Sequence, residues 1–240
     1  MHKKIEGIIV SEFPFEESSK IIKVLTSTGV ISIIAKGAMK IKSPFFSSTS
    51  KLSYGTFNII YKENTLSKLI DSDITKDYRN IKKDITKISY ATYLTELILK
   101  VSKHEHNKNI YVLFILSLDK INEGYDPLII TDIIKLKMLN YLGIKPVIDR
   151  CVSCGNTTDI VTISSYLGGL VCKNCHKNEA LVSSKTIKLI RILYYIDINK
   201  ITKIDISDDI KKEIDSFIND YYDRYSGIYL KSKILLDTIK

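Results

Sequence analysis

Along residues 4–72, short runs of β-branched and aromatic residues alternate with polar positions and are separated by turn residues. A period of two is typical of strands that bury one face. The pattern predicts five strands: KIEGIIVSEF, SKIIKVLTS, GVISIIAKG, YGTFNIIYK and LSKLIDS. TSTG at residues 26–29 is typical of a hairpin turn between the second and third. Five short strands predict a small barrel of the OB-fold type, with an SH3-like barrel or a sandwich as the alternative.

After Lys76 the apolar residues change to helical spacing. Between Ile85 and Val101 they recur every three to four positions, which is typical of an amphipathic helix. The segment NIYVLFILSLDKINEG predicts a second helix that ends at Gly124. His104–His106 is interpreted as the polar end of the first helix rather than as a metal site.

Capping residues mark the remaining helices. Asp126, followed by proline, is the expected N-cap of a third helix, which Gly143 ends. Ser183 or Ser184 begins a fourth. Ser207 is predicted to cap a fifth, which has acidic residues in its first turn.

The cysteines of the chain all lie in one stretch, with the spacing C-x2-C-x17-C-x2-C. They are Cys151, Cys154, Cys172 and Cys175. Two residues between cysteines let a tight turn place both sulfurs on one ion, and two such turns complete a tetrahedron. Four thiolates leave no open position for water, so the pattern favours one structural Zn²⁺ over a catalytic ion. We predict that this ion replaces a hydrophobic core in a loop too small to have one.

The expected fold is therefore α+β and multidomain. An N-terminal OB-fold β-barrel is followed by an all-α domain with an inserted four-cysteine zinc finger. We assign residues 1–76 to a nucleic-acid-binding barrel and 77–240 to the helical domain, with the finger at 150–178.

Charge points to a polyanionic partner. The chain has 36 Lys and Arg against 27 Asp and Glu, a formal net charge of +9. Nucleic acid is the simplest partner for such a chain, and an acidic membrane surface is the second. No signal peptide and no apolar run of membrane-spanning length is evident, so a cytoplasmic protein is predicted. In that reducing compartment, paired cysteines are more often metal ligands than disulfides.

Between Glu17 and Glu63 the chain has no acidic residue. Within this interval, the lysines predicted to follow a phosphate backbone are Lys20, Lys23, Lys36, Lys40, Lys42 and Lys51. Phe45 and Phe46 could stack on exposed bases, although core positions at the start of a strand are the simpler interpretation. The lysines could also form an ordinary solvated face, but the absence of acidic residues favours a binding surface.

No phosphate-binding loop, dinucleotide-binding fingerprint or HExxH motif occurs, so we expect no enzymatic activity. Two alternatives remain open. One is a zinc-stabilised scaffold for protein contacts with only incidental DNA affinity, and the other is a zinc enzyme acting as a hydrolase or deaminase.

Several stretches resemble, in order, the RecO family of bacterial recombination mediators. They are GIIVSEFPFEESSKIIKVLTSTGVISIIAKGAMKIKS, ISYATYLTELILKV, KLKMLNYLGIKPVIDRCVSCG, GGLVCKNC and YYDRYSGIYLKSKILLD. The block LNYLGIKPVIDRCVSCG is the most specific, because it joins a helix end to the first cysteine pair. The resemblance implies an OB-fold followed by a helical domain with a zinc finger in many members.

The resemblance also implies a function. Such proteins bind single- and double-stranded DNA and anneal complementary strands without covalent chemistry. With RecR and RecF, they help load the RecA recombinase onto DNA coated with single-strand-binding protein, whose C-terminal tail they contact. A cytoplasmic, nucleoid-associated location without membrane contact follows.

The basic motif that reads K-G-A-R-K-x-K-S in relatives stands here as KGAMKIKS. Lys36, Lys40 and Lys42 match this motif. Met39 replaces the usual arginine, and Pro44 follows where another basic residue is common.

Overall fold

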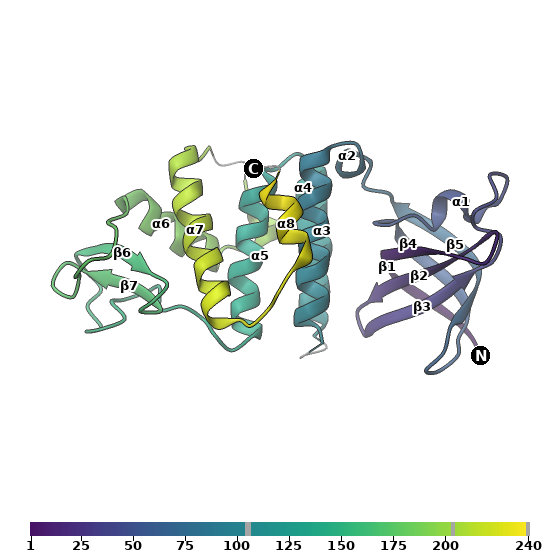
Figure 1. Ribbon diagram of the computed structural model, residues 1–240, viewed down its shortest axis with the longest axis horizontal. Helices are drawn as coiled ribbons and strands as arrows, with labels where there is room; N and C mark the ends of the chain where they lie inside the picture. Colours follow the sequence, from purple (N-terminus) through teal and green to yellow (C-terminus); the bar gives the residue numbers. More distant parts are fainter. Residues whose placement is uncertain (104–106, 203–204, 239–240) are drawn as a thin grey trace. The chain divides into compact units, whose positions relative to one another are not determined.

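The computed structural model describes residues 1–103, 107–202 and 205–238 (Figure 1). The chain forms two compact units. The first comprises Met1–Lys83 with a short segment that ends at Val112, and the second comprises the rest. His104–His106, interpreted above as the polar end of a helix, lies outside the described residues.

The first unit is a closed five-stranded barrel. Its strands are β1 (His2–Phe15), β2 (Ser19–Thr26), β3 (Gly29–Ala35), β4 (Tyr54–Ile60) and β5 (Ser67–Lys76). They follow the order β1-β2-β3-β5-β4, and β1 closes the barrel against β4. The β3–β5 pair is parallel and the other pairs are antiparallel. The barrel is an OB-fold, which confirms the prediction and excludes the SH3-like and sandwich alternatives.

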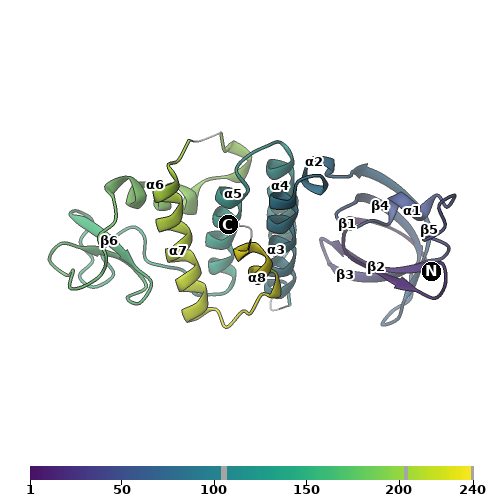
Figure 2. The same cartoon turned by 45° about the horizontal axis from the view of Figure 1, so that its top comes forward.

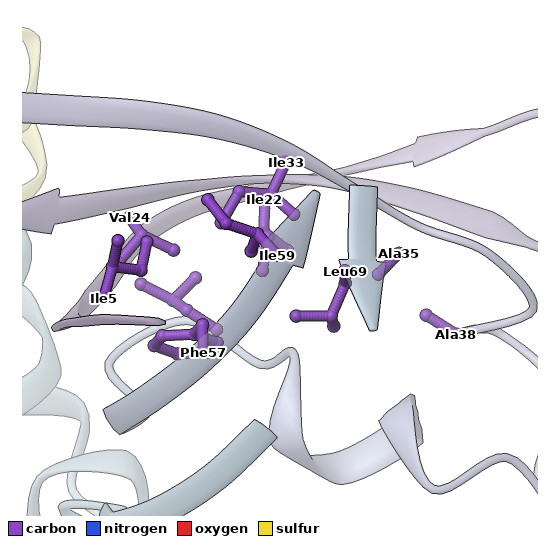
Figure 3. Packing of buried hydrophobic residues seen from close by; sticks show 10 residues of the cluster. Ile5, Ile22, Val24, Ile33, Ala35, Ala38, Phe57, Ile59 and Leu69 are labelled. Atoms are coloured by element: carbon purple, nitrogen blue, oxygen red, sulfur yellow. The ribbon is translucent and has the colours of Figure 1, made fainter. Parts of the chain in front are cut away.

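Alternation along the strands directs one set of side chains into the barrel. These side chains pack together as Ile5, Ile9, Ile22, Val24, Ile33, Ala35, Ala38, Phe57, Ile59 and Leu69 (Figure 3). None of them is more than 7% exposed. The largest is Phe57, and truncation of a buried phenylalanine to alanine typically costs about 3–5 kcal/mol.

Gly55 of β4 lies close to the backbone of β5. A Cβ atom at this position would lie 2.0 Å from the backbone oxygen of Asp73 in β5. On its other side Gly55 pairs with Gly7 of β1. The absence of side chains here lets β4 fit between its two neighbours and complete the barrel.

The rest of the chain is mainly helical. The helices are α1 (Phe45–Ser48) within the barrel unit, then α2 (Arg79–Lys82), α3 (Ile85–Val101), α4 (Lys108–Asn122), α5 (Pro127–Tyr141), α6 (Ser184–Tyr195), η1 (Ile198–Lys200), α7 (Asp208–Tyr225) and α8 (Lys231–Asp237). A hairpin of β6 (Ile160–Ser164) and β7 (Gly169–Cys172) lies between α5 and α6. Helix α5 contacts α3, α6 and α7 (Figure 2). None of the described helices is long and apolar enough to cross a membrane.

The three predicted N-cap positions agree with the structure, and two of these residues make a capping hydrogen bond through the side chain. The Asp126 carboxylate accepts the backbone N–H of Leu128 at 2.9 Å at the start of α5. The Ser183 hydroxyl accepts that of Thr186 at 3.0 Å, which settles the choice between the two serines. Ser207 holds the predicted N-cap position of α7, although its side chain makes no capping hydrogen bond. Two aspartates in the first turn complement the helix dipole there instead.

The variant Gly55→Ala is expected to destabilise the barrel by about 1–3 kcal/mol, because the added methyl group meets backbone that cannot move aside. Hydrogen exchange of the β4 and β5 amides would measure the loss and separate it from effects on the helical unit. The control variant Thr56→Ala changes a half-buried neighbour and should cost less than about 1 kcal/mol. Equal protection in the two variants would contradict the steric argument.

Candidate metal centre and nucleic-acid interface

The four cysteine sulfurs converge. All four Sγ atoms lie within 4.8 Å of one another, and those of Cys154 and Cys172 are 3.6 Å apart. A tetrahedral ion with bonds of about 2.3 Å to sulfur would require sulfurs about 3.8 Å apart. The cluster therefore has the size and donor set of a four-thiolate metal centre.

Two similar backbone turns place the sulfurs. In the first, the N–H of Gly155 donates to the oxygen of Cys151 at 2.9 Å, and Gly155 adopts a φ of +78°. In the second, the N–H of His176 donates to the oxygen of Cys172, also at 2.9 Å. Each turn closes over a C-x-x-C pair, as the spacing predicts.

The pKa values of two of these thiols are shifted in opposite directions. Burial raises the pKa of Cys151, but hydrogen bonds from the backbone N–H groups of Cys172 and Cys154 outweigh it and lower the pKa to about 6. The pKa of Cys175 is raised to about 12, first by its hydrogen bonds with the sulfurs of Cys154 and Cys172. Four thiolates this close repel one another, and a shared cation offsets that repulsion.

His176 is oriented for another contact. Its Nε2 atom lies 2.8 Å from the backbone oxygen of Glu179. This contact occupies Nε2. Among the described residues, the group of side chains close enough together to hold a metal ion comprises the four cysteines and does not include His176.

The hairpin that carries the second cysteine pair is attached to the segment that follows α5. Val147 donates its N–H to the oxygen of Gly168, and its own oxygen accepts the N–H of Leu170, both at 2.9 Å. A Cβ atom at Gly169 would lie only 2.1 Å from the Val147 oxygen. Close backbone approach thus joins the cysteine-bearing hairpin to residues 145–150 (Figure 1).

Three of the predicted phosphate-contacting lysines lie in the turn segment between β3 and α1. Lys36, Lys40 and Lys42 are all exposed. The segment is held in place because the N–H of Met39 donates to the oxygen of Ser18, at the tip of the β1–β2 hairpin, at 2.9 Å. The basic motif therefore forms a supported, accessible loop at one end of the barrel.

The other three predicted lysines lie outside this loop, on β2 and just before β4. Lys23 is exposed on β2, opposite Ser32 of β3. The Lys20 ammonium forms an ion pair with Glu12 at 2.6 Å, and the same carboxylate accepts the backbone N–H of Lys51 at 2.9 Å. Glu12 therefore offsets the positive charge of Lys20, whereas Lys51 meets it through its backbone N–H.

The two phenylalanines do not start a strand. Phe45 and Phe46 begin the short helix α1, and β4 starts only at Tyr54. Phe45 is half-buried against the barrel core, whereas Phe46 is 46% exposed. The interpretation as strand-start core residues is thus wrong in its element, and the two rings differ in accessibility.

The sequence analysis did not predict two exposed apolar side chains of the barrel unit. Ile41 is 85% exposed between Lys40 and Lys42. Phe13 is 52% exposed because the pairing of β1 with β2 shifts between Ile9 and Ser11. Such a bulge reverses the inward and outward positions, and an alternating pattern carries no sign of it.

Comparison with known proteins gives consistent matches along the chain. The family described as "Recombination protein O N terminal" matches residues 1–78, and "Recombination protein O C terminal" matches residues 82–234. A protein of Listeria monocytogenes serotype 4b named "DNA repair protein RecO" is 34% identical over 98% of this chain and 93% of its own length. Proteins of the same name from Halalkalibacterium halodurans and Bacillus pumilus are each 33% identical, over 100% and 99% of this chain and over 96% and 94% of their own lengths.

We expect the purified protein to hold one metal ion per chain, bound by four sulfurs, as measured by elemental analysis and X-ray absorption. The variant Cys172→Ser should lose the ion and lower the melting temperature of the helical unit by roughly 5 °C or more, because the hairpin loses its cross-link. The control variant Ser153→Ala changes an exposed position of the first turn and should keep the ion and the melting temperature. A metal shell that includes oxygen or nitrogen would contradict this geometry.

Proposed function

The chain belongs to the RecO family, and on that premise we propose that it is a DNA-binding recombination mediator without enzymatic activity. In this proposal it anneals complementary strands and helps load the RecA recombinase onto DNA coated with single-strand-binding protein. The observation that carries the proposal is the exposed lysine loop on an OB-fold barrel in a chain with this membership.

DNA binding is assigned to the barrel, residues 1–76. Lys36, Lys40 and Lys42 are the principal phosphate contacts, since their side chains are exposed. Lys23 is a further contact on β2, and Phe46 offers an accessible ring for a base. Lys20 and Phe45 make weaker contributions, because Lys20 is paired with Glu12 and Phe45 packs on the core. Lys51, which is half-buried, is also a weaker contact.

The metal is assigned as one structural Zn²⁺ held by the four cysteines of the finger, residues 150–178. Thiolate ligands in a tetrahedral arrangement suit this ion, and four of them saturate it. The role of the ion is to hold the finger within the helical domain, residues 77–240. A saturated shell leaves no position for a hydrolytic water, which argues against the zinc-enzyme alternative.

The proposed partners are single- and double-stranded DNA, RecR and the C-terminal tail of single-strand-binding protein, with RecF and RecA as indirect partners. Apolar and basic groups of the helical domain are the expected receptors for such a tail, which offers acidic residues and a terminal carboxylate. The proposed location is the cytoplasm, in association with the nucleoid.

Strand annealing over a salt series, with and without single-strand-binding protein, tests this function. We expect ATP-independent annealing whose rate falls steeply with salt, because phosphate contacts release counterions. Persistence of annealing on DNA coated with single-strand-binding protein would support the mediator role. Absent or salt-insensitive DNA binding, beside intact binding of the protein partners, would favour the scaffold alternative.

The triple variant Lys36→Ala, Lys40→Ala, Lys42→Ala should flatten the dependence of log affinity on log salt by about 2 for single strands, since each lost phosphate contact removes about 0.7. Fluorescence anisotropy with a labelled oligonucleotide would measure the slope. A matched triple variant of Lys200, Lys212 and Lys231, exposed lysines of the helical unit, should leave the slope unchanged. If the wild-type protein and the two triple variants show equal slopes, the loop does not contact DNA.

A further inference from the structure

A groove lies in the helical unit where the chain leaves α5 and approaches the first cysteine pair. Its volume is about 560 Å³, within the range of roughly 300–1,000 Å³ typical of ligand sites. Its lining includes Asn140, Lys145, Asp149, Arg150, Tyr194 and Tyr195. Most of these residues belong to the LNYLGIKPVIDRCVSCG block, to which the proposed function gives no role beyond the cysteines.

Two exposed basic side chains line this groove. Lys145 and Arg150 are exposed, and neither forms an ion pair within the described part of the chain. Helix α6, which supplies one wall, carries three basic side chains and no acidic one. Asp149 adds a carboxylate to the lining, and both of its oxygens lie 2.8 Å from the hydroxyl of Tyr195. The lining therefore contains these two basic side chains and one carboxylate that is engaged with Tyr195.

Two tyrosines form an aromatic wall. The rings of Tyr194 and Tyr195 meet edge to face, with their centroids 5.0 Å apart. Hydrogen bonds hold both hydroxyls, because Tyr194 donates to the Asn140 side chain and Tyr195 donates to Asp149. Tyr195 nevertheless remains 60% exposed. Its ring is therefore held at one end and open to a stacking partner.

The opposite wall is also held in place. Arg191 of α6 donates from Nε to the backbone oxygen of Ile148 at 2.9 Å. On its other side the same segment pairs through Val147 with Gly169. A groove whose walls are fixed before binding loses little conformational entropy when a ligand enters.

We infer that this groove binds single-stranded nucleic acid, with one base stacked on Tyr195 and flanking phosphates at Lys145 and Arg150. A duplex keeps its bases stacked inside, whereas an unpaired base can turn outward into a pocket of this size. The inference rests on the proposed DNA binding and adds a contact in the helical unit to those of the barrel.

Anisotropy of the full-length protein with a fluorescein-labelled 20-nucleotide oligothymidine tests the contact. Tyr195→Ala should weaken binding about fivefold or more, because it removes a stacked ring, whereas Tyr195→Phe should stay within about twofold. The double variant Lys145→Ala, Arg150→Ala should flatten the dependence of log affinity on log salt by about 1.4, since each lost phosphate contact removes about 0.7. The control pair Lys200→Ala with Lys212→Ala makes the same change in charge on exposed lysines outside the groove and should have no effect.

A direct readout is photo-cross-linking with the same oligonucleotide carrying 5-iodouracil, followed by peptide mapping. Cross-links on Tyr195 or Tyr194 are expected. If the wild-type protein binds, but the groove variants match it and cross-links occur only in the barrel, the inference is wrong and the proposed function stands. If the wild-type protein does not bind the oligonucleotide at any salt concentration, both the inference and the proposed function are wrong. If the groove variants lose binding of an acidic peptide but bind the oligonucleotide like the wild-type protein, the groove is a peptide site and the inference is wrong.

Discussion

Close backbone approach at two glycines is the constraint on which both surfaces depend. At Gly55, β4 comes so near β5 that any side chain would collide with backbone, and the barrel closes there. At Gly169, the hairpin of the finger comes equally near Val147. The first contact completes the barrel that carries the lysine loop, and the second fixes one wall of the groove. In each unit, a contact made by backbone alone supports the side chains that face a ligand.

Charge is distributed in the same way in the two units. The barrel carries its lysine loop within the stretch from Glu17 to Glu63 that lacks acidic residues. Helix α6 lies within a second such stretch, between Glu179 and Asp197. The exposed aspartates of the barrel, Asp71 and Asp73, lie on β5, which pairs with both β3 and β4. Positive charge concentrated in one stretch of a unit favours one orientation of a polyanion over others.

Alternation, capping residues and cysteine spacing were sufficient to predict the strands, most helices and the cysteine cluster, because each depends on neighbours in sequence. The remaining features depend on tertiary contacts. Lys135 is 2% exposed within α5, where its ammonium lies 2.7 Å from the Asn219 oxygen and 3.4 Å from an Asp215 oxygen on α7. A periodic pattern assigns such a lysine to the surface. The bulge that exposes Phe13 has no local signature either, and the groove joins residues more than forty positions apart.

The position of the four cysteines relative to the groove bears on how the proposed structural ion would serve the proposed DNA binding. Arg150 directly precedes Cys151, and the Ile148 carbonyl beside it is held by Arg191. A centre that fixes Cys151 therefore also limits the movement of a proposed phosphate contact. The segment would lose its conformational entropy when the metal binds and the domain folds. Because this loss would precede DNA binding, it would not reduce the affinity for DNA. On this argument, the ion acts on nucleic-acid binding through the rigidity of residues 145–151, without any contact between metal and ligand.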